Sequence, residues 1–173
     1  MTVLVLTGSA RRDSLTRRLG EQLVAATPGA VLAPRLTEIP FFDQDLEVSP
    51  PAAVQALRDQ VAAAHIVVVV TPEYNGTIPG LLGNTIDWLS RPYAGSPAVL
   101  RDKPVVAVAA SPGGIGGVRA LVALRTVLGN AGAEVLDVQL SVPEVHVRLD
   151  DASLAAELEV LVEQLTEIPA RAA

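Results

Sequence analysis

Cysteine is absent from the 173-residue chain, and its absence removes several kinds of chemistry at once. Disulfides, thiolate nucleophiles and cysteine-based metal sites are all excluded. Aromatic residues are also scarce, at 3% of the sequence, so Tyr74, Trp88 and Tyr93 stand out by lying close together along the chain. Trp88 and Tyr93 are either core packing residues or neighbours of a site.

Positive charge is the minority sign in this sequence. The 13 Lys and Arg residues face 19 Asp and Glu residues, which gives a net charge of −6. Because binding to nucleic acid requires a basic face, nucleic acid is not expected as the main partner. No apolar run approaches the roughly 20 residues that cross a bilayer, and no charged segment precedes the apolar residues at 3–6. We therefore expect no signal peptide, no membrane span and a cytoplasmic location.

Short apolar runs alternate with amphipathic stretches along the chain. The runs predict strands at 3–6, 31–36, 66–71, 104–110 and 135–142, and helical spacing of Leu and Val predicts helices at 15–23, 54–64, 81–89, 118–128 and 154–165. This alternation is typical of an α/β doubly wound parallel sheet with helices on both faces. Five strands favour the flavodoxin-like order 2-1-3-4-5. We expect a single domain over residues 1–173, ending in a frayed tail at 166–173.

In that strand order, the loops that follow strands one, three and four meet at one edge of the sheet, where ligands bind. The first of these loops carries Gly8, several hydroxyl groups and Arg11, and the next helix begins with Arg17 and Arg18. Arginines near a helix N-terminus oppose the helix dipole, which favours a bound phosphate. The alternative is that Ser14 merely caps the helix and the arginines are solvated. Neither a P-loop nor a Gly-x-Gly-x-x-Gly pattern is present.

The other two loops are also unusual. Residues 71–80 contain two prolines and two glycines directly after a run of five β-branched residues, and such a stiff polar loop suits a flat ligand that forms hydrogen bonds. Residues 113–117 contain four glycines, which form either a flexible turn or a place where the backbone approaches a ligand closely. Acidic residues at 43–47 are more typical of a solvated loop than of a metal site. No acid–base pair or Gly-x-Ser-x-Gly elbow indicates a hydrolase.

Three motifs resemble the NAD(P)H-dependent FMN reductase family, which includes quinone, azo-dye and chromate reductases. Residues 8–16 read GSARRDSLT, residues 72–88 read PEYNGTIPGLLGNTIDW and residues 111–117 read SPGGIGG. The family patterns are GSxRxxSxN, PEYN followed by PGxLKNxxDW, and SxGxxGG. Thr16 departs from the usual Asn, and Gly83 departs from the usual Lys. The resemblance covers residues 1 to about 145.

The resemblance implies a bound FMN and an electron donor, NADPH or NADH. It places the FMN phosphate on the first motif, the flavin ring against the backbone of the second, and the third motif on the other side of the flavin. The implied cofactor-binding residues are Ser9, Arg11, Ser14, Leu15, Thr16, Arg17, Pro72, Glu73, Tyr74, Asn75, Gly76, Ser111, Gly113 and Gly114. No side chain is expected to be catalytic, because the cofactor supplies the reactivity.

The resemblance further implies a homodimer or a tetramer, with the helix at 81–88 near the contact. Leu82, Ile86 and Leu89 either form that contact or face the sheet. The expected activity is hydride transfer from NAD(P)H through FMN to an acceptor such as a quinone, an azo compound, a metal oxyanion or free flavin. Two alternatives are a flavodoxin-type electron carrier without NAD(P)H oxidase activity and a scaffold protein that binds no flavin.

Overall fold

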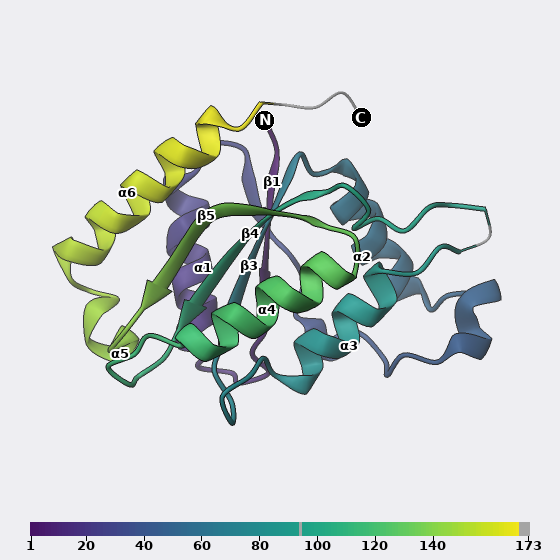
Figure 1. Ribbon diagram of the computed structural model, residues 1–173, viewed down its shortest axis with the longest axis horizontal. Helices are drawn as coiled ribbons and strands as arrows, with labels where there is room; N and C mark the ends of the chain where they lie inside the picture. Colours follow the sequence, from purple (N-terminus) through teal and green to yellow (C-terminus); the bar gives the residue numbers. More distant parts are fainter. Residues whose placement is uncertain (94, 170–173) are drawn as a thin grey trace.

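A five-stranded parallel sheet forms the centre of the computed structural model, which describes residues 1–93 and 95–169 (Figure 1). Its strands are β1 (Val3–Thr7), β2 (Ala30–Leu32), β3 (Ile66–Pro72), β4 (Pro104–Ala110) and β5 (Glu134–Val142). Neighbouring strands are parallel throughout, in the order β2-β1-β3-β4-β5. The predicted flavodoxin-like topology is confirmed.

Helices cover both faces of the sheet, as Figure 1 shows. Helices α1 (Leu15–Ala26) and α6 (Ala152–Glu167) pack on one face. Helices α2 (Ala52–Ala63), α3 (Gly80–Leu89) and α4 (Val118–Asn130) pack on the other. Central strands are therefore shielded on both sides, and every residue of β4 is buried.

The structure corrects the predicted second strand. Only residues 30–32 pair with β1, and Leu36 begins a 3₁₀ turn, η1 (Leu36–Glu38). The backbone of Ala33 still donates to Val5, but the chain then leaves β1, and Arg35 is already the N-cap residue of η1. A second 3₁₀ turn, η2 (Gln44–Val48), and a short helix, α5 (Val145–Arg148), were not predicted. Helix α6 includes two residues of the expected tail, while residues 170–173 lie outside the described residues.

Trp88 and Tyr93 are packing residues. Trp88 is fully buried, its ring meets Phe42 edge-on with centroids 5.0 Å apart, and its indole N–H donates to the Pro40 carbonyl at 2.8 Å. Asn84, one turn earlier on α3, donates to the same carbonyl at 2.9 Å and accepts from the Phe42 N–H at 2.7 Å. This part of the second motif therefore holds the segment around residues 40–42 against α3.

Leu82, Ile86 and Leu89 are also buried, within the core between α3 and the sheet. Of the two roles left open for them, these side chains take the one that faces the sheet. The outer surface of α3 carries other residues, among them Gly83 and the exposed Asp87. Although the residue is exposed, partial desolvation of its carboxyl group raises the pKa of Asp87 above its ordinary value.

Arg58 of α2 is a cation inside this core, with only 2% of its surface exposed. Its guanidinium donates to the carbonyls of Trp88, Arg91 and Pro97 and lies 4.1 Å from the centre of the Tyr93 ring. Burial lowers the pKa of Arg58, while nearby Tyr93 raises it. The carbonyl groups replace water around the buried charge and tie α2 to the end of α3.

Candidate functional site

A cavity of about 140 Å³ opens at the carboxyl edge of the sheet, where the loops after β1, β3 and β4 meet. Parallel strands place these loops at one end of the molecule, the lower end in Figure 1. Residues from all three loops and from α5 line the cavity: Ser9, Arg11, Ser14, Leu15, Thr16, Pro72, Glu73, Tyr74, Ala110, Ser111, Pro112 and Val145.

The loop after β1 presents buried hydroxyl groups to this cavity. Ser9, Ser14 and Thr16 are each less than a tenth exposed, and the Ser14 and Thr16 hydroxyl oxygens lie 3.0 Å apart. Ser14 caps α1 by accepting the N–H of Arg17 at 3.1 Å. The predicted capping role is therefore real, but it leaves the hydroxyls at the cavity wall. The first turn of α1 contains no acidic residue, so the positive end of its dipole is not neutralised within the helix.

Arg35 holds the same loop from outside. Its guanidinium donates to the carbonyls of Arg11 and Arg12, each at 3.1 Å. The Arg11 side chain lines the cavity and has no hydrogen-bond partner among the described residues. Arg18 pairs instead with Asp150 at 3.3 Å, on the exposed surface. The Arg11 guanidinium is thus available to bind a ligand in the cavity.

Arg17 does not line the cavity. Its Nε pairs with Glu21 at 3.2 Å, one turn along α1. Its Nη1 atom is buried without a hydrogen-bond partner in the part of the chain that the structure describes. The sequence-based assignment of Arg17 to the cofactor stays a prediction.

The loop after β3 is a two-residue β-hairpin turn. Tyr74 and Thr77 exchange two backbone hydrogen bonds of 3.0 Å, and Asn75 and Gly76 both have positive φ angles, 53° and 74°. This geometry is a type I′ turn, for which Asn-Gly is the preferred pair. The turn explains the sequence between the two prolines and fixes Tyr74, which is 42% exposed, at the cavity rim.

Glu73 lines the cavity but directs its carboxylate to α4. Its Oε2 atom accepts the backbone N–H groups of Arg119 and Ala120, at 3.1 and 3.3 Å. The Glu73 side chain is only 12% exposed. The two loops on either side of the cavity are therefore connected through this side chain.

Two of the glycines in the loop after β4 are required by the backbone conformation and packing of the loop itself. Gly116 and Gly117 have positive φ angles, and a Cβ atom at Gly116 would lie 2.8 Å from the nitrogen of Pro143. By contrast, Gly113 and Gly114 are exposed, and a Cβ atom would be accommodated at both. Backbone hydrogen bonds of 3.1 Å join Ser111 to Val142 and to Val145, which brings α5 to the cavity.

Most of the residues predicted for the cofactor come together in this cavity. Those that do not line it are Arg17, Asn75, Gly76, Gly113 and Gly114. Sequence reasoning missed Ala110, Pro112 and Val145. Ala110 and Pro112 flank the predicted Ser111 and could have been included, whereas Val145 begins α5, a short helix after β5 that carries no motif.

Neither the acidic segment at 43–47 nor His65 lines the cavity. Across residues 1–93 and 95–169, no group of three or more His, Cys, Asp or Glu side chains is arranged to hold a metal ion. In the acidic segment, Asp43 caps η2 and Glu47 pairs with Arg91 at 2.6 Å. His65 contacts the backbone and hydroxyl of Thr2, next to the amino-terminal ends of β1 and β3 and thus at the opposite end of these strands from the loops. Within the described residues, no helix is both long and apolar enough to span a bilayer.

Comparison with known proteins identifies relatives of this arrangement. Residues 1–147 match a family described as NADPH-dependent FMN reductase. A quinone reductase of Escherichia coli K12 is 39% identical over 137 residues, which cover 74% of this chain and 69% of that protein. A 2-hydroxy-1,4-benzoquinone reductase of a Burkholderia species is 32% identical over 166 residues, covering 94% and 87%.

A solved structure extends the comparison to the fold. The flavoenzyme FerB of Paracoccus denitrificans, an NAD(P)H:(acceptor) oxidoreductase, superimposes with a TM-score of 0.85 at 29% identity. The match covers 96% of this chain and 95% of that protein.

Proposed function

The chain belongs to the NADPH-dependent FMN reductase family, and from that premise we propose that it transfers hydride from NADPH or NADH, through bound FMN, to a small-molecule acceptor. The observation that carries the proposal is the cavity at the carboxyl edge of the sheet, which is lined by buried hydroxyl groups and by Arg11, whose side chain has no partner among the described residues. We favour a quinone as acceptor, because the E. coli and Burkholderia relatives are both named as reductases of quinones. Azo compounds, metal oxyanions and free flavin are other acceptors to test.

The donors in the cavity fit the phosphate end of FMN. A phosphate dianion accepts hydrogen bonds and attracts positive charge, and the loop after β1 offers hydroxyl donors, Arg11 and the N-terminus of α1. Glu73 is the one carboxylate among the cavity-lining residues, and it belongs to the opposite loop. The cavity is smaller than the roughly 300–1,000 Å³ of typical sites for drug-sized ligands. A phosphate group would therefore occupy the hollow, and a larger ring would extend along its open rim.

The chain's own residues would bind and orient the cofactor and leave the chemistry to it. Ser9, Arg11, Ser14 and Thr16 would hold the phosphate. The hairpin at Tyr74 and the opposite wall at Ser111 would border the ring. Bound FMN supplies the hydride-accepting chemistry, so the protein needs no acid–base side chain at this site.

We also propose that the protein functions as a homodimer. Helices α3 and α4 lie side by side on one face of the sheet (Figure 1). The outer surface of α4 exposes Val118 and Val122, and Ile115 is exposed just before the helix. Such a cluster of exposed apolar residues supports a contact with a second copy of the chain. A tetramer would add a further contact of the same kind.

The proposed activity is tested with the purified protein, FMN and NADPH under anaerobic conditions. We expect a visible flavin band near ~450 nm that bleaches when NADPH is added and recovers when a quinone follows. Bound flavin that NADPH cannot reduce would favour an electron carrier. Failure of the protein to bind FMN would reject the assignment of the cavity.

A further inference from the structure

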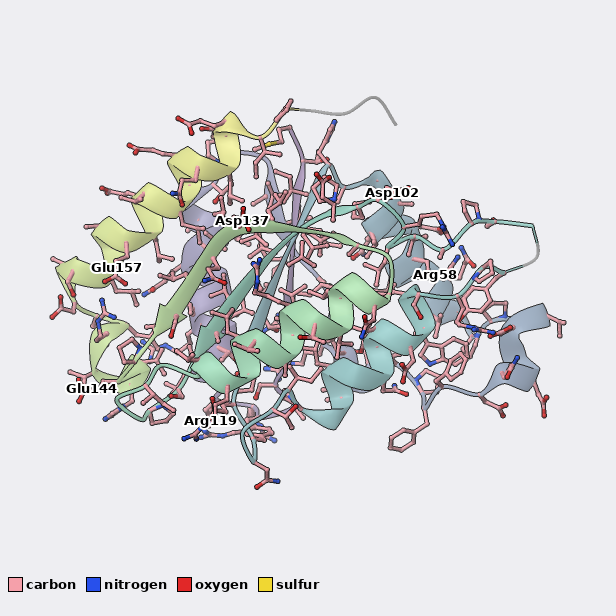
Figure 2. All side chains as sticks on the ribbon, viewed as in Figure 1. Arg58, Asp102, Arg119, Asp137, Glu144 and Glu157 are labelled. Atoms are coloured by element: carbon pink, nitrogen blue, oxygen red, sulfur yellow. The ribbon has the colours of Figure 1, made fainter. Side chains whose placement is uncertain are left out.

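Glu73 makes three contacts with one end of α4. Besides the backbone N–H groups of Arg119 and Ala120, its carboxylate meets the Arg119 guanidinium at 3.5 Å. Figure 2 shows Arg119 beside the loop that follows β3. Because Arg119 is 69% exposed and its ion pair is long, the two backbone hydrogen bonds are the substantial part of this contact.

Helix α4 has no N-terminal cap from its own sequence. Its N-cap residue is Gly117, at φ 79°, which has no side chain to accept a hydrogen bond, and its first turn contains no acidic residue. The first N–H groups of a helix lack partners within the helix and require acceptors from elsewhere. Glu73 supplies that acceptor from a loop 46 residues earlier in the chain.

This cap fixes the distance between the two loops that face each other across the cavity. The start of α4 packs closely on the end of β4, because a Cβ atom added at Gly117 would lie 3.3 Å from Ala109 Cβ. The hairpin at Tyr74 follows Glu73 directly, and Ser111 follows β4 directly, and both line the cavity. The hydrogen bonds of the Glu73 side chain therefore link the hairpin at Tyr74 to the start of α4. This link sets the position of the hairpin relative to the loop after β4.

We propose that Glu73 is a positioning residue for the flavin ring, and that it acts through the N-terminus of α4 rather than by touching the cofactor. The proposal rests on the proposed function, because it requires FMN in this cavity. In this proposal, the acidic residue of the PEYN motif sets the spacing between the loop after β3 and the loop after β4. Reach to the α4 backbone should then matter more than negative charge.

Two conservative substitutions separate reach from charge. Glu73→Gln keeps the side-chain length and a carbonyl oxygen that can accept the N–H groups, but it loses the charge. Glu73→Asp keeps the charge but is one methylene shorter. We expect Glu73→Gln to bind FMN within about threefold of the wild-type dissociation constant, and Glu73→Asp to bind about tenfold more weakly, in line with loss of a helix cap.

A matched control distinguishes positioning from general stability. Asp151 caps α6 by accepting the Ser153 N–H at 2.6 Å, and α6 lies on the other face of the sheet. Asp151→Ala should lower the melting temperature of the FMN-free protein by an amount similar to that for Glu73→Asp, with FMN affinity unchanged.

The outcomes of a fluorescence titration with FMN are distinct. Weak binding by Glu73→Asp with retained binding by Glu73→Gln supports the proposal. Equal affinities for both variants and wild type, or equal losses in both variants, would overturn it, since reach would then not be the deciding property. Failure of the wild-type protein itself to bind FMN would reject the proposed function instead.

Discussion

Arg11 combines the properties expected of a phosphate ligand. Its side chain lines the cavity and makes no hydrogen bond to another described residue, and Arg35 donates to its backbone carbonyl. Arg11→Ala should therefore weaken FMN binding by about 1–3 kcal/mol, the range for a charge-assisted hydrogen bond. The measurement is a fluorescence titration at fixed ionic strength.

Arg12 provides the control for that change. It belongs to the same loop and its carbonyl also accepts from Arg35, but its side chain does not line the cavity. Arg12→Ala should leave the FMN dissociation constant nearly unchanged. Equal losses for the two variants would mean that general positive charge, and not a contact from Arg11, attracts the ligand.

Because of Tyr93, we expect the folded protein to lose stability in alkaline solution. Its hydroxyl donates to the Trp88 carbonyl at 2.9 Å, and burial raises the pKa of Tyr93 to about 12, although the Arg58 guanidinium opposes this shift. In the unfolded chain the phenol titrates near ~10. Above that pH the unfolded state binds fewer protons than the folded state, so the stability contributed by Tyr93 is lost as pH rises from about 10 to about 12.

Tyr93→Phe isolates this effect. The variant should be about 1 kcal/mol less stable than wild type near neutral pH, because one buried hydrogen bond is lost. Its free energy of unfolding in urea should then fall less steeply than that of wild type as the pH rises above 10. Parallel pH profiles for the two proteins would show that Tyr93 does not titrate differently in the folded state.

Individual site residues were predictable where their chemistry is local. Ser9, Ser14 and Thr16 surround a helix N-terminus in the sequence itself, so their grouping at one site could be predicted without a structure. The contact of Glu73 with α4 joins residues 46 positions apart, and nothing in the motif indicates which loop its carboxylate meets. Long-range contacts of this kind require the folded structure.

At the scale of elements, the sequence predicts what depends on burial and fails where single hydrogen bonds decide. Strand β4 is apolar throughout and β3 is apolar as far as Val70 because both faces are covered, and their predicted positions agree closely with the structure. Strand β2 is short because the chain leaves β1 after Ala33 and enters η1 at Leu36. Helix α5 has only four residues, too few to produce a helical pattern in the sequence.

Helix α3 contains a glycine that the fold does not require. Gly83 lies in the helix interior, and an added Cβ atom would meet nothing within 4 Å. Gly83→Ala should therefore raise the free energy of unfolding by about 0.5–1 kcal/mol, because alanine has the higher helix propensity. Urea denaturation monitored by circular dichroism measures the change.

The same substitution in α1 should have the opposite effect. A Cβ atom at Gly20 would lie 2.8 Å from Thr7 Cγ2 and 3.3 Å from Val5 Cγ1, both in β1 beneath the helix. Gly20→Ala should destabilise the protein, typically by 1–3 kcal/mol for an overpacked core. If both variants were stabilised, helix propensity alone would be the deciding factor.

Across the whole molecule, the helices on the two faces of the sheet bury two separate core clusters. Helices α1 and α6 bury one core cluster, and α2, α3 and α4 bury the other. The cavity lies at the carboxyl edge of the sheet, and among the helices α1 contributes Leu15 and Thr16 to its lining and α5 contributes Val145. That the whole sequence forms a single domain stays a prediction, since the last four residues lie outside the described part of the chain.

The proposed homodimer gives the prediction that belongs to the whole molecule. Val118 and Val122 are spaced four residues apart, so they share the outer face of α4, and both are exposed in the single chain. A lysine in the middle of an apolar contact would be buried without a partner, so Val122→Lys should weaken dimerisation at least about tenfold. Light scattering after size exclusion should give wild type twice the 18.0 kDa mass of one chain and give the variant the mass of one chain.

Val160→Lys is the control, because Val160 is similarly exposed but lies on α6, which packs on the opposite face of the sheet. That variant should remain dimeric. A wild-type monomer would refute the proposed dimer. A dimer that persists in Val122→Lys but dissociates in Val160→Lys would show that the contact is on α6 and not on α4. Glu73 lines the cavity and accepts hydrogen bonds from the start of α4, so a contact on α4 would also bring the two proposed flavin sites of a dimer close to its interface.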